Sequence, residues 1–599
     1  MISKKNFFTI SVMMVVVFFL FMVTGGAKQA LSNYEENEYV PTSWTVSDTS
    51  EADFSLSTGG VLYLGDSQKV LNRLKEWCYY NQRGLEELDH GVGYEGTEEN
   101  LSMLVVDGAS LTDKDEDVLL EASETGLTLV FATMPSCEYL QEHTNVAQLM
   151  GIRAIQKEST SLVGMHLYEG FLLGGEKVYE LGDEDPLYYQ DMNLHIPWYI
   201  LESASKVYMS GYLNKLYKDA DVSYTPPIIW RYNTKNGYVY AINNNFMEDL
   251  SALGIYTAVE STREEIAIYP VINAKSLVVT NYPTFTEENE EQISELYSRN
   301  TTNYLETLVW PTIMAVSSYN KMKPGFFIST KLDYDSENGP SEKALHYFME
   351  LIRESHGEAG LSLDAYSDIS AEEKLSIDLD FFKDTLEDYH FYSCYVGDSD
   401  LEEALTLLNT TGENISLVVS DYSKNQNLIW AQDNVIGVSE TTSSQYYSFT
   451  KDFTLKSVET ALGYSMASVD ASSLVYPKTT ESHLQNFTEE YSGTINSLYE
   501  NFEDFEATSL TETGNRIRNY LNLDYDADVS MEKDRVTITT NTYGEEQFFI
   551  LKIPNMEIRF ISQGEYEELE DGVYLVTTTS SETVIKLKEK DQSLLKYFR

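Results

Sequence analysis

Two carboxylates follow a strongly apolar segment near the middle of the chain. Residues 325–328 read Gly-Phe-Phe-Ile, and Asp333 and Asp335 come shortly after them. We expect a buried strand here that ends in these carboxylates, and residues two apart on an extended chain face the same side. Such a pair can bind a divalent cation, because hard cations accept shells made only of oxygen ligands. Asp421, at the end of a later predicted strand over 415–420, can supply a third carboxylate.

The histidines do not complete a nitrogen-rich metal shell. The chain has 8 histidines, and no two of them have the His-x-x-x-His spacing that puts two imidazoles on one metal ion. His346 lies in a predicted helical core stripe, where a packing role is expected. Lys331, just before the carboxylates, can pair with them in place of a cation. The carboxylates therefore have two readings, a working acidic site and a retired one.

Cys137 is the cysteine that could be a nucleophile. It stands in Met134-Pro135-Ser136-Cys137-Glu138, directly after a predicted strand over 127–133. A sharp nucleophile turn needs glycines beside the reactive residue, and this segment has none. We therefore favour a buried or half-buried structural cysteine. With only 3 cysteines, far apart, the chain has no disulfide framework.

The elements around these residues predict an α/β multidomain protein. Strands at 61–65, 103–107 and 127–133 alternate with helices, one capped by Asp66 and Ser67, which predicts a doubly wound domain over 58–260. The next domain spans 265–480. After the carboxylates it has a helix that begins after Ser341, strands at 360–364, 391–397 and 415–420, and a second helix over 399–408 between the last two strands. After a helical linker, short runs from 536 to 587 predict an antiparallel β domain within 481–599.

Two of these predicted domains resemble known protein families. Residues 103–133 and 236–247 resemble class I glutamine-amidotransferase-like domains. The strand, carboxylate pair, helix and strand of 325–364 resemble the opening of polysaccharide deacetylases, in the branch that modifies the Pel exopolysaccharide. The resemblance implies a deacetylase-like β/α barrel, with Asp333 at the catalytic-base position, Asp335 as a metal ligand and zinc as cofactor if the site is active. The family pattern has His and Gly where this chain has Lys331 and Ser336.

The N-terminus predicts export. Lys4 and Lys5 precede an uncharged apolar run over 7–23, so 1–30 is either a signal anchor, the reading we favour, or a cleaved signal peptide. Residues 31–57 are rich in Ser, Thr, Glu and Asn and predict a stalk. The bulk of the chain is then extracellular, in a single-pass membrane protein or a secreted one. The lysine-led signal and scarce cysteines are typical of bacteria.

The charge limits the partners. With 41 Lys and Arg against 96 Asp and Glu, the net charge is −55, which excludes nucleic acid as a natural partner and permits a cationic one. The run 287–291 is expected to be a solvated, acidic helix start. The chain has 44 Tyr, and the clusters 187–189, Trp198 with Tyr199, and 445–447 are candidate carbohydrate subsites, Tyr446 and Tyr447 among them.

These observations combine into one expectation with alternatives. We expect a non-catalytic, deacetylase-like scaffold protein that binds an extracellular polysaccharide, such as a cationic amino-sugar polymer, beside a polysaccharide synthase membrane complex. The first alternative is an active metal-dependent polysaccharide N-deacetylase. A binding protein for small solutes is the second, because a two-layer α/β domain also allows it.

Overall fold

A computed structural model describes most of the chain after residue 36. The described residues are 37–42, 59–93, 101–213, 225–386, 389–423, 426–432, 434–443, 446–477, 484–500, 502, 505–530, 534–541 and 544–590. The predicted anchor at 1–30 lies outside them, as does the apolar run 7–23. Among the residues described, no helix is both long and apolar enough to cross a membrane.

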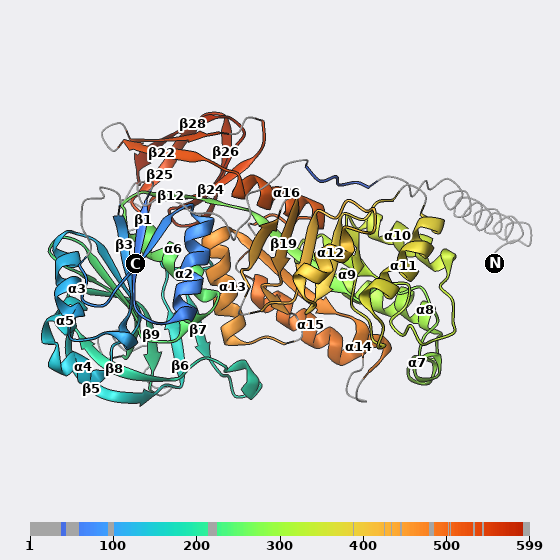
Figure 1. The fold of residues 1–599 in the computed structure, drawn as a ribbon, viewed down its shortest axis with the longest axis horizontal. Coiled ribbons are helices and arrows are strands. Elements are labelled where there is room, and N and C mark those ends of the chain that lie inside the picture. The colour runs from blue at the N-terminus through green and yellow to red at the C-terminus, as the bar shows by residue number, and fades with distance from the viewer. Residues whose placement is uncertain are drawn as a thin grey trace, which may run out of the picture.

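A nine-stranded mixed sheet forms the first unit, at the left of Figure 1. The strands lie in the order β2-β1-β3-β4-β11-β10-β9-β6-β7, parallel from β2 to β11 and antiparallel from β11 to β7. A separate ribbon pairs β5 (Ile152–Ser161) with β8 (His195–Leu201). The bounds are β1 (Gly60–Leu64), β2 (Gly84–Leu88), β3 (Leu101–Asp107), β4 (Thr128–Thr133), β6 (Gly164–Leu167), β7 (Lys177–Glu180), β9 (Ser205–Tyr212), β10 (Pro227–Asn233) and β11 (Tyr238–Ile242).

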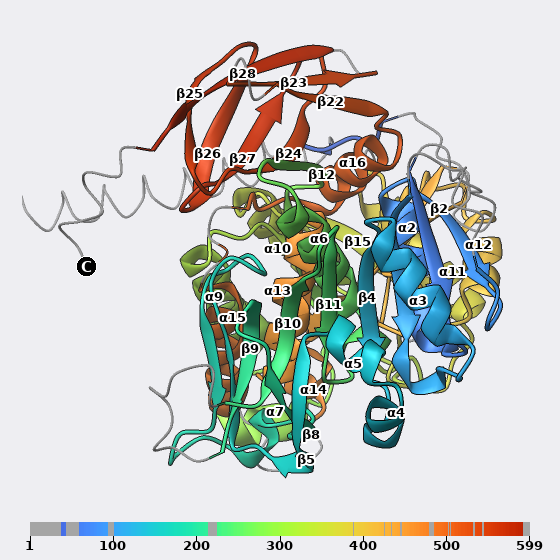
Figure 2. The ribbon, with the colours of Figure 1, turned by 90° about the vertical axis from the view of Figure 1, so that its left-hand side faces the viewer.

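Helices cover both faces of this sheet. α2 (Gln68–Tyr80) begins after Ser67, whose Oγ accepts a hydrogen bond from the Val70 amide, so the predicted cap is present. α3 (Asp115–Glu124), α4 (Cys137–Glu142) and α5 (Thr144–Leu149) pack on one face of the sheet, on the side that faces the viewer in Figure 2, and α2 and α6 (Ser251–Arg263) pack on the other face. The parallel half of the sheet matches the predicted alternation, and the antiparallel half was not predicted.

The second unit is built on a curled sheet. Its order is β18-β19-β17-β16-β15-β14-β13-β21-β20, and every neighbouring pair is parallel except β18 with β19. The strands are β13 (Ala274–Thr280), β14 (Pro324–Ile328), β15 (Glu358–Ser362), β16 (Ser393–Gly397), β17 (Leu417–Ser420), β18 (Ile429–Gln432), β19 (Val435–Ser439), β20 (Thr442–Ser443) and β21 (Tyr464–Asp470).

One stretch of chain joins the two ends of the curled sheet. β19 pairs with β17, and the amide of Glu440 still donates to Ser420 of that strand. The next residue, Thr441, donates instead to Met466 of β21, where β20 continues the pairing. The residues from 435 to 443 therefore bond to both ends of the sheet and draw it round on itself. Side chains at the carboxyl ends of the parallel strands consequently face a common mouth.

Helices surround this sheet, and the predicted ones are present. α10 begins after Ser341, and α12 begins after Asp400, whose Oδ1 accepts from the Glu403 amide. The helical segments are α7 (Glu290–Tyr297), α8 (Thr301–Tyr304), a π-helical turn (Leu305–Val309), α9 (Trp310–Tyr319), α10 (Glu342–Glu354), α11 (Ala371–Thr385), α12 (Leu401–Leu408), α13 (Phe449–Leu462), α14 (Ser472–Val475), α15 (Leu484–Tyr499) and α16 (Leu510–Leu521).

Two four-stranded antiparallel sheets form the C-terminal β domain, above the other units in Figure 1. One sheet has the order β22-β23-β28-β25 and the other β12-β24-β27-β26. β12, just after the predicted boundary at 260–265, pairs with β24 and so ties the first two units to this domain. The bounds are β12 (Ala267–Val271), β22 (Tyr525–Ser530), β23 (Arg535–Thr540), β24 (Gln547–Lys552), β25 (Met556–Ile561), β26 (Gly564–Glu570), β27 (Val573–Thr578) and β28 (Glu582–Glu589).

The first two units share one hydrophobic core. α6 of the first unit packs directly on α13 of the second, at the centre of Figure 1. At Gly254 the helices are so close that an added Cβ would lie 2.3 Å from the Ser457 carbonyl oxygen. A glycine is therefore required here for packing, and the two units are held in a fixed relation.

Candidate functional site at the mouth of the curled sheet

Four acidic residues stand at the carboxyl ends of the curled sheet's strands. Asp364 follows β15, Asp421 follows β17, Glu440 follows β19, and Asp470 ends β21. The sheet order brings these strand ends round one opening. In α/β proteins this end of the sheet is where ligands bind, because loops can vary there without disturbing the core.

Asn281 bridges two of these acids. It follows β13, and its Nδ2 donates to Asp364 Oδ2 at 2.8 Å and to Asp470 Oδ1 at 3.0 Å. Asn281 has a φ of 59°, a left-handed conformation that asparagine tolerates better than most residues. Burial raises the pKa of Asp364, and repulsion from Asp470 adds to this, while the Asn281 amide lowers it. Asn281 therefore lets two carboxylates approach one another.

Tyr395 and Ser468 hold the other two acids. Tyr395 of β16 donates a 2.6 Å hydrogen bond from its hydroxyl to Asp421 Oδ1. Ser468 of β21 donates to Glu440. Burial raises the pKa of Glu440, and the Asp421 carboxylate raises it further, against the opposing charge of Lys451. The mouth therefore combines a carboxyl group of raised pKa with a second carboxylate, the pairing that acid–base chemistry uses.

A buried ion pair supports the loop after β14. Lys374 of α11 donates to Asp378 Oδ2 at 2.7 Å, and the two side chains are 0% and 2% exposed. Lys374 also donates to the Ser362 carbonyl at the end of β15. Asp378 in turn accepts from the Thr330 amide and, at 2.6 Å, from the Tyr334 hydroxyl. The network therefore ties the loop that contains Asp333 to β15, which is the next strand of the sheet.

Asp333 and Asp335 do not extend the strand as predicted. β14 ends at Ile328, and the chain then leaves the sheet because Glu288 accepts hydrogen bonds from the amides of Leu332 and Asp333. The two acids lie in a turn in which the Asp335 amide donates to Asp333 Oδ1 at 3.0 Å. Asp335 is exposed, and Lys331 donates to the Ser336 carbonyl.

Glu288 is a buried acid beside the candidate base Asp333 that the sequence pattern misplaced. It was expected in a solvated acidic run, yet it is 2% exposed. Its carboxylate accepts from the backbone at 332 and 333 and from Tyr476, and burial raises its pKa. Its neighbour Glu287 fits the expectation better, because it caps α8 through the Thr301 amide. Nothing in the run of like residues marks which one turns inward.

The residues of the mouth do not fit a zinc shell. Within the described part of the chain, no three His, Cys, Asp or Glu side chains are close enough to hold a metal ion. The acids at the mouth accept hydrogen bonds from Asn281, Tyr395, Ser468 and Ser472, and none of these donors is an imidazole. Their oxygen donors suit a hard cation better than zinc, which prefers nitrogen and sulfur.

Aromatic side chains from two units meet beside the mouth. Tyr446 packs edge-to-face on Tyr188, with ring centroids 5.5 Å apart, and Tyr447 packs likewise on Tyr189 at 5.2 Å. Tyr446 is 44% and Tyr188 51% exposed, whereas Tyr447 is buried. The structure thus unites two of the three clusters predicted from sequence.

Lys451 links this aromatic pair to the acids. Its Nζ lies 3.8 Å from the Tyr446 ring centroid and donates to Ser443 Oγ at 3.0 Å. Its charge acts on Glu440, which stands three residues before Ser443 on the same stretch of chain. The exposed rings of Tyr446 and Tyr188 therefore border the acidic mouth, an arrangement of flat apolar faces beside polar groups that suits a sugar.

The remaining candidates lie elsewhere. Trp198 is on β8 in the separate ribbon, with Lys157 Nζ 5.9 Å from its ring centroid. Cys137 starts α4, and burial raises the pKa of its thiol, opposite to what a thiolate nucleophile needs. All three cysteines are free thiols.

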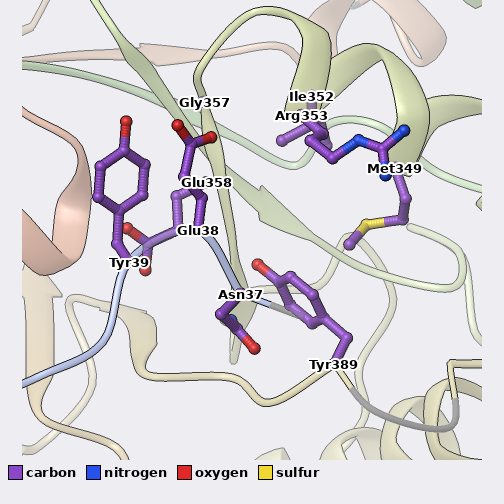
Figure 3. Close-up of a pocket in the computed structure, with 9 residues that line it drawn as sticks. All are labelled: Asn37, Glu38, Tyr39, Met349, Ile352, Arg353, Gly357, Glu358 and Tyr389. Carbon is purple, nitrogen blue, oxygen red and sulfur yellow. The ribbon is translucent and has the colours of Figure 1, made fainter. Parts of the chain in front are cut away.

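Two hollows flank the curled sheet. A groove of about 620 Å³ runs between the starts of α11 and α12 near Leu363, at the mouth end, and Glu372, Asp400, Glu402 and Glu403 line it. A small cavity of about 40 Å³ lies at the opposite end, where Figure 3 shows Tyr39 and Glu38 beside Glu358 at the start of β15. Residues 37–42, within the predicted stalk, thus pack on the underside of the sheet.

Comparisons with known proteins are distant. No protein-family model matches the chain, and no curated protein matches it. Among solved structures, the carbohydrate deacetylase Agd3 is 12% identical with a TM-score of 0.49, over 88% of this chain and 98% of that one. The exo-beta-1,4-mannosidase Op5Man5 from Opitutaceae bacterium strain TAV5 is 11% identical with a TM-score of 0.22, over 31% of each chain.

Proposed function

We propose that the mouth of the curled sheet binds an extracellular polysaccharide that contains amino sugars. The observation that carries this proposal is the exposed pair Tyr446 and Tyr188 at the border of Glu440 and its acidic neighbours. Pyranose rings stack on exposed aromatic faces, and carboxylates accept hydrogen bonds from sugar hydroxyl and ammonium groups.

The charge favours a partly deacetylated polymer. The chain carries −55 overall, and acids line both the mouth and the adjoining groove. The net negative charge attracts a cationic amino-sugar chain over a distance. The carboxylates of the mouth and the groove then bind its ammonium groups at short range. The sequence resemblance points to a Pel-type exopolysaccharide, and such a polymer is cationic when it is partly deacetylated.

We also propose that the protein is anchored in the membrane through residues 7–23. There it acts beside a polysaccharide synthase membrane complex. The support is the lysine-led apolar run in the sequence. Residues 37–42 meet the sheet at the end opposite the mouth, so a tether on that side leaves the mouth open to a polymer. Protease protection of intact bacteria expressing the chain tests this placement, because an exported chain is cleaved without lysis.

The alternative is an active polysaccharide N-deacetylase. What favours it is the raised pKa of Glu440 and Asp364 beside the carboxylates of Asp421 and Asp470. What opposes it is the donor set, which lacks the nitrogen ligands of a zinc shell. We favour binding without turnover.

One experiment separates the two. The full-length protein is titrated calorimetrically with acetylated and deacetylated amino-sugar oligomers, and acetate is assayed in the same samples with and without added zinc, manganese or magnesium. Saturable binding without acetate supports the scaffold function. Acetate release that is lost in Asp421→Asn supports the enzyme. Neither binding nor release, in a folded sample, contradicts both.

A further inference from the structure

A separate pocket lies where the first unit meets the C-terminal β domain. It has a volume of about 480 Å³ and is bordered by β9, β10, the end of α6 and the strands β24, β26 and β27. Leu172, Leu173 and Val573 give it apolar walls. Three cationic side chains, Lys206, Arg231 and Lys552, also line it, in a protein that has few cations to place.

Lys206 and Arg231 stand directly opposite each other. They are register partners on the antiparallel strands β9 and β10, so both side chains lie on the same face. Like charges in this position destabilise a sheet. Repulsion from Arg231 accordingly adds to burial in lowering the pKa of Lys206. The chain keeps this unfavourable pair although acids outnumber bases more than twofold.

Neither cation has a carboxylate partner among the described residues. Lys206 Nζ lies 4.8 Å from the Tyr208 ring centroid. Arg231 lies over the Tyr238 ring and donates from Nη1 to the Thr262 carbonyl at 2.9 Å. Its Nε is buried, with no hydrogen-bond partner in the described structure. The guanidinium also interacts with the Tyr240 hydroxyl, so its neighbours are hydroxyl, carbonyl and ring groups and not a carboxylate.

Lys552 brings a third cation from the other side. It is 9% exposed, and its Nζ donates to Ser261 Oγ at 3.2 Å, at the end of α6. Burial lowers its pKa to about 8, and Glu570 acts in the opposite direction. An anion in the pocket would favour the charged form of this lysine.

The carboxylates around the pocket are mostly engaged. Glu570 accepts from the amides of Gly174 and Gly175. Glu264 pairs with Arg263 at 3.1 Å, and Asp571 pairs with Lys590 at 2.6 Å. Glu169 is exposed at the rim. Of these acids, Glu570 is the one whose charge acts on Lys552, so the pocket leaves Lys206 and Arg231 without a carboxylate partner among the described residues.

We propose that this pocket binds an oxyanion, a phosphate or carboxylate group, between Lys206, Arg231 and Lys552. The anion relieves the repulsion between the two opposed cations and supplies the negative partner that both lack. The oxyanion can be a free inorganic ion or the acidic group of a sugar, for which the apolar walls leave room. A bound ligand would join the first unit to the C-terminal domain, independently of the mouth.

The test is calorimetric titration of the full-length protein with inorganic phosphate and, separately, with glucuronate, at constant ionic strength set with sodium chloride. Saturable binding of phosphate alone identifies a free oxyanion, and tighter binding of glucuronate identifies an acidic sugar. Either supports the proposal. Saturable binding of neither ligand overturns it.

Lys206→Gln is the test variant, because the Lys206 side chain is partly exposed and glutamine can take its place on the surface of β9. It should weaken binding at least about tenfold, since it removes a charge-assisted hydrogen bond. Without ligand it should raise the melting temperature, because it removes a like-charge pair. Lys157→Gln is the matched control, because Lys157 is another exposed lysine over an aromatic ring. It should change neither the affinity for the anion nor the melting temperature. Unchanged affinity in Lys206→Gln would refute the site.

Discussion

The Tyr395 hydroxyl donates a 2.6 Å hydrogen bond to Asp421 Oδ1, and this bond joins β16 to the residue that follows the adjacent strand β17 at the mouth of the curled sheet. Asp421 also acts on Glu440, so the position of one phenol determines how two carboxylates meet. Tyr395→Phe should lower the free energy of unfolding by about 1.5–3 kcal/mol, the usual worth of a hydrogen bond to a charged group. Urea denaturation measures it. Tyr392→Phe, nearby on the same segment, is the control and should change stability by less than about 0.5 kcal/mol.

Glu440 should make the fold less stable as the pH rises. Its pKa in the folded protein is above the ordinary 4.5, so the folded state holds its proton longer than the unfolded state. Stability is therefore lost as the pH climbs from the unfolded pKa through the folded one. Glu440→Gln keeps the acceptor for Ser468 and removes the charge.

The expected result is a variant equal to wild type near pH 4 and more stable than wild type at pH 7. The groups that act on Glu440 are Asp421, Lys451 and Ser468. The difference between variant and wild-type denaturation midpoints across this range isolates their effect from the protein's other acids. A difference that is independent of pH would contradict the account.

The buried ion pair of Lys374 and Asp378 should contribute far more to the free energy of unfolding than an exposed ion pair does. Lys374→Met leaves the Asp378 carboxylate buried without its cation, which costs about 3–5 kcal/mol. Lys69→Met removes an exposed partner of Glu248, with the lysine 71% exposed, and should cost less than about 1 kcal/mol. Chemical denaturation of both variants gives the comparison. Similar losses would show that the network is not what fixes the loop.

Two glycines in helices should respond to alanine with opposite signs. Gly254→Ala forces α6 away from Ser457 of α13, and overpacking of this kind costs about 1–3 kcal/mol. Gly493 in α15 has open space where a Cβ would stand. Gly493→Ala should therefore stabilise the protein by about 0.5–1 kcal/mol, the helix propensity difference. Thermal melts of both variants check the signs.

Local patterns predicted individual elements well. Strands at 61–65, 103–107 and 127–133 and the helix after Ser341 lie within two residues of their predicted ends. These elements have strong apolar periodicity and clear caps, which act locally. β13 and β21, which hold the mouth together, were not singled out, because their pairing spans about two hundred residues and leaves no mark nearby.

The site was predicted only in part. The sequence offered Asp421 as a candidate metal ligand and Tyr446 as a candidate carbohydrate contact; the structure brings both to the mouth, and their roles stay predictions. It did not identify Asp364, Glu440 or Asn281, because isolated acids after weak strands look like any surface acid. Asp333 remains an untested candidate base, now beside Glu288 rather than on a strand. Which of several acids turns inward depends on contacts with distant residues.

The most direct test of the central claim is oligosaccharide binding to Tyr446→Ala. Loss of one aromatic face should cost about 0.5–1.5 kcal/mol, a two- to tenfold rise in Kd for an amino-sugar oligomer. Tyr566→Ala on β26 is the matched control, because Tyr566 is 43% exposed against 44% for Tyr446 and also packs edge-to-face on another tyrosine. We predict weaker binding in the first variant and unchanged binding in the second. Equal affinity in both variants and wild type would contradict a carbohydrate site at this mouth.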